Sequence, residues 1–202
     1  GMFRGCSGLT SVSISESVTS IGANAFDGCT GISWIYIPES VNSIGRDAFK
    51  GTEWYNKMNG DGLVYVGNVA YEYRGKMPDN TTIILKEGTT GISEWAFNEC
   101  VGLTSIVIPK SVKNIGDWAF YKCSNLTSIE IPDGVTRIGE NTFSMCENLS
   151  SITLPESLTE IDSHAFLGCS ALTSVILPDG LNSIGQEAFF NCTGLTSVSV
   201  PA

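Results

Sequence analysis

Cysteine is the residue of this 202-residue chain whose number and spacing most invite a chemical role. Consecutive cysteines are 23 residues apart, except for one gap of 71 residues, which is three periods plus two. One cysteine per structural unit forms a row with about 5 Å between neighbours, the spacing of adjacent strands, whereas zinc needs four converging ligands. Parallel Cβ vectors also suit a disulfide poorly, so we predict a ladder of buried, reduced thiols. The row comprises Cys6, Cys29, Cys100, Cys123, Cys146, Cys169 and Cys192.

The single histidine, His164, follows Asp162 and Ser163 and superficially resembles part of a hydrolytic triad. A triad requires convergence of its groups in space, which three adjacent residues on one turn cannot supply. We therefore predict that His164 is an exposed turn residue. The glycines near Gly62 and Gly67 do not open a helix, so a phosphate-binding loop is not expected either.

An acidic residue recurs after the predicted strand of most units. Such a row could attract Ca²⁺ or supply an acid and a base for catalysis, but Pro-Asp-Gly turn chemistry explains it as solvated turn residues. Lys110 interrupts the row and argues further against an ion ladder. We therefore predict no catalytic, metal-binding or cofactor-binding residues, and a protein that is not an enzyme. The acidic positions are Glu16, Glu39, Glu87, Asp133, Glu156 and Asp179.

The charge of the chain argues against several classes of partner. Asp and Glu number 21 against 11 Lys and Arg, which gives a net charge of −10. A nucleic-acid binder needs a basic face to displace counterions from phosphates, and docking on anionic membranes needs one too. No apolar run approaches the roughly 20 residues of a membrane-spanning helix, and no leader pattern is seen at the N-terminus. We expect an acidic protein that binds no nucleic acid and inserts in no membrane, with any signal peptide already removed.

The sequence from one cysteine to the next repeats as C-x-x-L-T-S-(I/V)-x-(I/L)-P-(D/E)-(S/G)-(V/L)-x-x-I-G-x-x-A-F-x-x. The L-T-S-I-x-I segment alternates apolar and polar residues, which predicts a strand, and Pro-Asp-Gly predicts a turn after it. The A-F-x-x-C tail predicts one short helical or 3-10 turn whose Phe and Cys face the core. Because one unit cannot bury its own apolar face, the units must stack. The phenylalanines expected inside are Phe26, Phe49, Phe97, Phe120, Phe143, Phe166 and Phe189.

This unit resembles the BspA-like, or treponemal-type, leucine-rich repeat in its L-T-S-I-x-I-P, V-x-x-I-G and A-F-x-x-C segments. The resemblance covers almost the whole chain. It implies a leucine-rich-repeat solenoid, a right-handed curved stack of 23-residue units with one parallel strand each. It also implies a cell-surface or secreted protein, mostly of bacteria, that takes part in adhesion and host contact.

Residues 52–76 fit the repeat poorly. Two alternating segments, residues 63–66 and 69–73, flank Gly67-Asn68, which predicts a β-hairpin with a type II′ or I′ turn. We expect this insertion to protrude from the stack. The chain starts and stops within a repeat, so we expect a single solenoid domain over residues 1–202 that is a fragment of a longer chain. The last strand, residues 195–200, then has an open edge, which predicts weak end-to-end self-association.

The outward strand positions carry mostly small hydroxyls, but Trp34 and Tyr36 replace Ser11 and Ser13 in the second unit. One outward row runs through Ser13, Tyr36, Ile84, Val107, Glu130, Thr153, Ile176 and Ser199. The insertion adds further aromatic residues, and clustered exposed aromatics are typical of a binding site. The alternative is that the insertion folds back and these aromatics cover one another. The candidate ligand-binding residues are Trp34, Tyr36, Trp54, Tyr55, Tyr65, Tyr71 and Tyr73.

Together these patterns favour a non-catalytic recognition module. Its expected partner is a host or extracellular-matrix protein, bound through the solenoid face and the aromatic insertion. Two alternatives stay open. A spacer that displays another domain is favoured by the long row of Ser and Thr, and a glycan-binding module is compatible with aromatic faces, which also stack on sugars.

Overall fold

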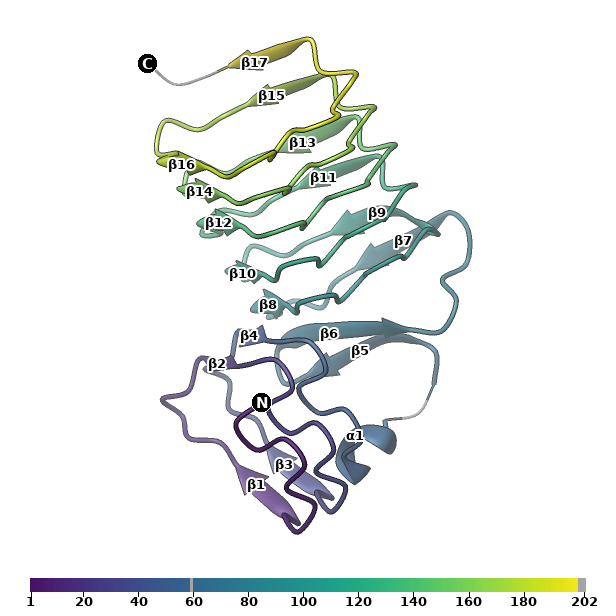
Figure 1. The fold of residues 1–202 in the computed structure, drawn as a ribbon, viewed down its shortest axis with the longest axis vertical. Coiled ribbons are helices and arrows are strands. Elements are labelled where there is room, and N and C mark those ends of the chain that lie inside the picture. Colours follow the sequence, from purple (N-terminus) through teal and green to yellow (C-terminus); the bar gives the residue numbers. More distant parts are fainter. Residues whose placement is uncertain (59, 200–202) are drawn as a thin grey trace.

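The computed structural model describes residues 1–58 and 60–199 and is a solenoid of stacked coils (Figure 1). One side of the stack carries strands of three to five residues, which we call the long strands. They pair in parallel, and Ser128 of one unit lies opposite Ser151 of the next, one period later. This confirms the predicted solenoid. The long strands are β1 (Ser11–Ser13), β3 (Trp34–Tyr36), β7 (Thr81–Ile84), β9 (Leu103–Val107), β11 (Ser128–Glu130), β13 (Ser151–Thr153), β15 (Ser174–Ile176) and β17 (Ser197–Ser199).

A second side of the stack carries two-residue strands, so most units contain two strands where the repeat predicts one. They arise from the I-G segment, whose isoleucine faces the core in most units. A Cβ at Gly45 would collide with the backbone nitrogen of Ala23 in the preceding unit, which explains the glycine. The short strands are β2 (Ser20–Ile21), β4 (Ser43–Ile44), β8 (Gly91–Ile92), β10 (Asn114–Ile115), β12 (Arg137–Ile138), β14 (Glu160–Ile161) and β16 (Ser183–Ile184).

The A-F-x-x-C tails form hydrogen-bonded turns and not the predicted helical or 3-10 turn. Most tails have a residue with left-handed backbone angles just before the alanine and another just before the cysteine, such as Asn24 at φ 56° and Gly28 at φ 73°. A left-handed residue interrupts a right-handed helix. The backbone N–H of Phe26 instead donates to the carbonyl oxygen of Ala48 in the next unit at 2.7 Å. The tails therefore bond to neighbouring coils as well as internally, as in the bond from the Cys29 N–H to the Phe26 carbonyl oxygen at 3.1 Å.

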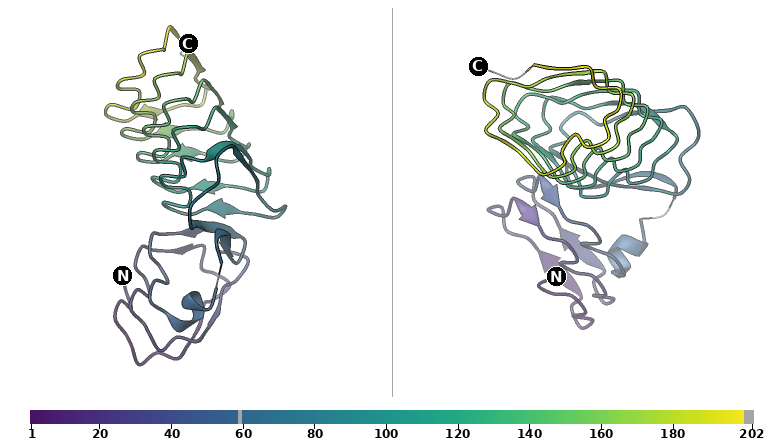
Figure 2. Two further views of the ribbon diagram at one scale, coloured as in Figure 1. Left: turned by 90° about the vertical axis from the view of Figure 1, so that its right-hand side faces the viewer. Right: turned by 45° about the horizontal axis from the view of Figure 1, so that its top comes forward.

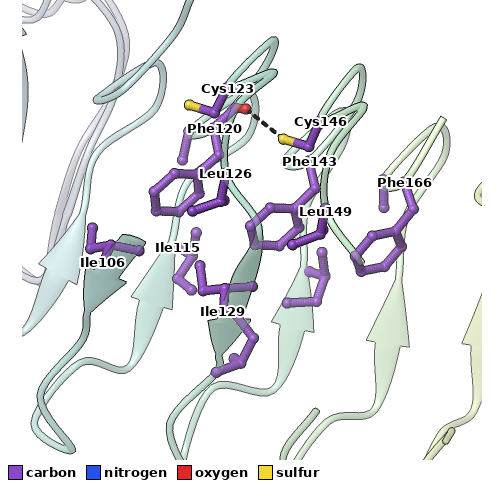
Figure 3. Close-up of a cluster of buried hydrophobic side chains, with 14 of the residues drawn as sticks. Ile106, Ile115, Phe120, Cys123, Leu126, Ile129, Phe143, Cys146, Leu149 and Phe166 are labelled. Carbon is purple, nitrogen blue, oxygen red and sulfur yellow. Dashed lines mark hydrogen bonds between the residues drawn. The ribbon is translucent and has the colours of Figure 1, made fainter. Parts of the chain in front are cut away.

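The core is built from ladders of identical side chains. We call the coils before the insertion (residues 1–51) the N-terminal stack and those after it (residues 77–199) the C-terminal stack. In the C-terminal stack, rings from Phe97 to Phe189 lie nearly parallel with centroids 5.0–5.4 Å apart. Figure 3 shows Phe120, Phe143 and Phe166 side by side, with leucines that precede the long strands and isoleucines of the strands beside them. The thiol of Cys146 donates to the carbonyl oxygen of Phe120 in the preceding unit at 3.1 Å. Both predicted ladders, of phenylalanine and of cysteine, thus hold the units together, although Phe189 is only partly buried and Cys6, contrary to the prediction, is exposed.

The insertion begins with a short helix and continues as the predicted hairpin. Helix α1 (Glu53–Asn56) is capped by the Thr52 hydroxyl, which accepts from the Tyr55 N–H at 3.1 Å. Strands β5 (Gly62–Val66) and β6 (Val69–Arg74) then pair antiparallel. Gly67 has φ 56°, while Asn68 is not among the residues with positive φ. This pattern is that of a type II′ turn, with glycine at its first central position.

The hairpin does not protrude, contrary to the expectation. Strand β6 pairs in parallel with β8, so the sheet order is β10-β8-β6-β5. Val66, Val69 and Tyr71 pack in the core of the N-terminal stack, whereas Ala70 packs in the core of the C-terminal stack. Because successive side chains of a strand point to opposite faces, the hairpin contributes to the cores on both of its sides. Burying apolar side chains on both faces of the hairpin is more favourable than leaving them in solvent, so the hairpin lies inside the stack.

The two stacks meet at this ribbon and at a polar contact beside it. The Glu94 N–H donates to the Ile44 carbonyl oxygen at 3.2 Å, and the Asn114 amide donates to the Asn42 side chain at 2.7 Å. The N-terminal stack lies on one side of the hairpin and the C-terminal stack on the other (Figures 1 and 2). The hairpin is therefore a joint within the solenoid.

The final strand is described only in part. Strand β17 pairs with β15, and residue Val200 of the predicted strand lies outside the described residues. Within the described chain, β17 has no second strand beside it. End-to-end association of copies through this edge stays a prediction.

Candidate functional site

Trp34 and Tyr36 lie on the outer face of β3, as the alternation predicts. Their side chains are 53% and 42% exposed, and the buried Ile35 lies between them. They sit opposite Ser11 and Ser13 of β1, so the first unit shows that the strand needs no aromatic residue there. We call Trp34 and Tyr36 the aromatic pair.

The Tyr36 phenol is held in place by a neighbouring unit. Its Oη donates to Oε1 of Glu16 at 2.7 Å. The hydrogen bond to this carboxylate raises the pKa of Tyr36, because it favours the protonated phenol. The aromatic pair therefore combines an exposed indole with an oriented phenol on a rigid strand.

The insertion contributes much less exposed aromatic surface than expected. Tyr55 and Tyr71 are 8% and 3% exposed and meet edge to face with centroids 5.5 Å apart. Tyr71 also packs edge to face against Phe49 at 5.8 Å. For these two tyrosines the geometry matches the alternative in which the aromatics of the insertion cover one another.

The other three aromatic candidates are partly buried and face different neighbours. Trp54 packs edge to face on Phe49 with centroids 5.2 Å apart. The Tyr65 Oη accepts from the Lys86 N–H at 3.1 Å, and the Lys86 ammonium lies 4.3 Å above the Tyr65 ring. Tyr73 packs against the core of the C-terminal stack. The seven candidates thus do not form one cluster, and the aromatic pair is the exposed part of the set.

A second aromatic group was not among the sequence candidates. Trp95 and Trp118 stack with centroids 5.0 Å apart, and the Arg46 guanidinium lies 4.2 Å above the Trp95 ring. Both tryptophans have positive φ, 62° and 61°, at a position where other units place residues such as Asn24. A bulky residue in this conformation is unusual. The sequence signal that could have found them is a tryptophan at a repeat position where other units have Asn, Asp or His. Because Arg46 belongs to the N-terminal stack, this column supports the joint.

The structure also places the groups that were considered for metal or acid–base chemistry. Within residues 1–58 and 60–199, no group of three or more His, Cys, Asp or Glu residues is arranged to hold a metal ion. His164 is a partly exposed turn residue with φ 58°, and its Nε2 lies 3.2 Å from Oε2 of Glu187. Its side chain thus contacts the next unit.

The cysteine ladder leads to a thiol-reactivity prediction. Six of the seven cysteines are buried, and Cys6 is exposed. Burial raises the pKa of Cys100 to about 12 and raises that of Cys123 as well, so these groups stay protonated and unreactive at pH 8. Because six of the thiols are buried, a disulfide reagent should modify one thiol rapidly in the native protein and six more after denaturation. Cys6→Ser should abolish only the rapid phase. Intrachain disulfides found by mass spectrometry would contradict the prediction.

The stacked parallel coils, the phenylalanine ladder and the exposed strand face define a leucine-rich-repeat solenoid, an architecture whose extended surfaces serve recognition. The model of the BspA type leucine rich repeat region matches residues 1–125 and 71–196, with six copies. The chain therefore belongs to the BspA-type leucine-rich repeat family. No curated protein matches it significantly.

Several solved structures are similar to this chain. A leucine rich cell surface protein from Faecalibacterium prausnitzii is 28% identical with a TM-score of 0.65, covering 98% of this chain and 61% of that one. A T. pallidum leucine rich repeat protein is 32% identical with a TM-score of 0.41, covering 84% and 68%. A leucine-rich repeat protein from Eubacterium ventriosum is 23% identical with a TM-score of 0.53, covering 96% and 44%. The chain spans less than two thirds of the first of these structures.

Proposed function

We propose that the protein is a recognition module of a bacterial cell-surface or secreted protein and binds an extracellular protein through the aromatic pair. The observation that carries the proposal is the exposure of Trp34 and Tyr36 where the first unit has serines. The cell-surface relative from Faecalibacterium supports the location. No helix in the described part of the chain has the length and hydropathy to cross a bilayer.

The chemistry of the aromatic pair suits a protein partner. Tryptophan and tyrosine supply large contact areas with few rotatable bonds, and their polar tips orient a ligand. They are also enriched among the residues that dominate binding free energy. Ile35, between them, is buried in the core and holds the backbone of β3 in place. The backbone therefore loses little conformational entropy when a partner docks.

The test is a screen against extracellular-matrix proteins and glycans, followed by variants of the aromatic pair. Trp34→Ala with Tyr36→Ala should weaken binding at least about tenfold, because each truncation at such a site typically costs more than about 1 kcal/mol. The fold should persist, since both residues are about half exposed and lie outside the buried core. Ser151→Ala, on the same face of a distant strand, is the control and should change neither binding nor stability.

Two results would contradict the proposal. If the double variant binds as the parent does, the site lies elsewhere. If the variant unfolds, the aromatic pair covers the N-terminal stack and has a structural role. Binding of glycans alone would favour the alternative of a glycan-binding module.

A spacer that displays another domain is the second candidate function. The observation that favours it is the row of small hydroxyls at one outward position of the long strands, from Ser105 to Ser197. Such a surface offers few anchors for a partner. Absence of binding to every screened protein and glycan would favour this role.

A further inference from the structure

A second surface on the C-terminal stack has features that the aromatic pair does not share. One outward row of the long strands carries aliphatic side chains that are well exposed, Ile84 at 73%, Val107 at 52% and Ile176 at 76%. The register places Ile84 beside Val107, and Glu130 beside Thr153. Ser13 and Ser199 hold the corresponding positions at the two ends of the solenoid, so the repeat does not require an aliphatic residue there.

This row borders a continuous groove at the carboxyl ends of the strands. A hollow of about 380 Å³ is lined by residues of β9, β11 and β13 and by the turns that follow them. A second hollow of about 230 Å³ continues toward β15, and the two share Thr153, Leu154 and Glu156. Val107 lies at one end of this groove and Ile176 at the other.

The charge of the groove is predominantly negative. Glu130, Asp133 and Glu156 line it, and Lys110 is its one lining cation. Neither Glu130 nor Glu156 forms an ion pair within the described residues. Carboxylates without a cation beside them attract a cationic partner most strongly, because no internal pair must be broken first.

The spacing of these features matches that of an extended polypeptide. Three strand intervals separate Val107 from Ile176, which is about 14 Å at the usual spacing. In an extended chain, residues i and i+4 point to the same side and are about 13–14 Å apart, with i+2 between them. Two aliphatic residues at i and i+4 would therefore meet Val107 and Ile176, while a basic residue at i+2 would lie near Glu130.

We propose that the groove along β9, β11, β13 and β15 binds an extended basic segment of a protein partner, with aliphatic residues four apart and Lys or Arg midway. The acidic lining selects the charge of the segment, and the two exposed aliphatic ends select its spacing. This site is separate from the aromatic pair, so it stands or falls independently of the function proposed above.

The experiment uses three labelled peptides and the protein titrated into them. The first contains Leu-Ser-Lys-Ser-Leu between glycines, the second has Glu in place of Lys, and the third has the composition of the first in the order Leu-Leu-Ser-Ser-Lys. We expect the first to bind most tightly, with affinity falling as salt is added. Binding should shift the NMR signals of the groove residues and leave those of Trp34 and Tyr36 unchanged.

Matched variants separate this groove from a general attraction to an acidic protein. Glu130→Gln with Glu156→Gln should weaken binding of the first peptide about fivefold, the order expected from two exposed charge pairs. Asp79→Asn with Glu147→Gln removes the same charge elsewhere and should have little effect. Ile176→Ser should also weaken binding, whereas Ile184→Ser, an exposed isoleucine on the short-strand side, should not.

The proposal is overturned by any of three results. The first peptide fails to bind, it binds no better than the other two, or the control variants weaken it as much as the groove variants do. In each case the exposed Ile and Val side chains reflect only the preference of strands for β-branched residues.

Discussion

Replacing Phe143 with alanine is expected to lower the free energy of unfolding by about 3–5 kcal/mol, the range for truncating a fully buried aromatic side chain. Phe143 is 0% exposed and stacks on Phe120 and Phe166 at 5.3 and 5.4 Å. Its carbonyl oxygen also accepts from the Cys169 thiol at 3.2 Å. Because each unit contacts only its neighbours, the cavity weakens two interfaces at once. Urea unfolding followed by circular dichroism measures the change.

Phe190→Ala is the matched control for this prediction. Phe190 directly follows the last rung of the ladder but is 52% exposed. Its truncation should change the free energy of unfolding by less than about 1 kcal/mol, because little apolar area leaves the core. Equal effects of the two variants would show that the phenylalanine ladder is not what holds the units together.

Tyr71→Ala is expected to destabilise the joint by a similar amount, about 3–5 kcal/mol. Tyr71 extends from β6 into the N-terminal core, where it packs against Phe49 and Tyr55. The C-terminal stack has its own cluster of buried residues, which does not include Tyr71. Loss of this ring should therefore loosen the N-terminal stack and leave the C-terminal stack folded. Hydrogen exchange should become faster in residues 1–58 and stay slow in β11 and β13.

Tyr36→Ala provides the control for the joint. It removes the same side chain from a position that is 42% exposed, so amide exchange in the N-terminal stack should stay close to that of the parent. Uniformly faster exchange in both stacks of Tyr71→Ala would contradict the assignment of two cores. It would mean that the solenoid unfolds as a single cooperative unit.

The periodic part of the molecule was predictable because its information is local and repeated. A period of 23 residues places equivalent residues in neighbouring coils, so the register of Ser128 with Ser151 follows from counting. The Phe and Cys ladders follow in the same way, since an apolar residue repeated at one position must stack on its own copies. The outward position of Trp34 and Tyr36 follows from strand alternation.

Features that depend on contact with a neighbouring coil were decided only by the tertiary structure. The two-residue strands at the I-G segments are too short to show alternation, and they exist because the next coil supplies their hydrogen bonds. The left-handed turns of the tails likewise depend on bonds to the next unit, such as that of Phe26 to Ala48.

The insertion shows the same limit most clearly. Its sequence alone determined a hairpin with a Gly67-Asn68 turn, because turn chemistry is local. Whether Tyr71 pointed to solvent or into a core depended on what lay on each side of the ribbon. Only the folded chain brings β8 beside β6 and the Phe49 ring beneath Tyr71, so that burial of both faces places the hairpin inside the stack. The aromatic candidates were separated for that reason: those of the insertion meet neighbours in the folded chain, whereas Trp34 and Tyr36 stay exposed on the outer face of β3.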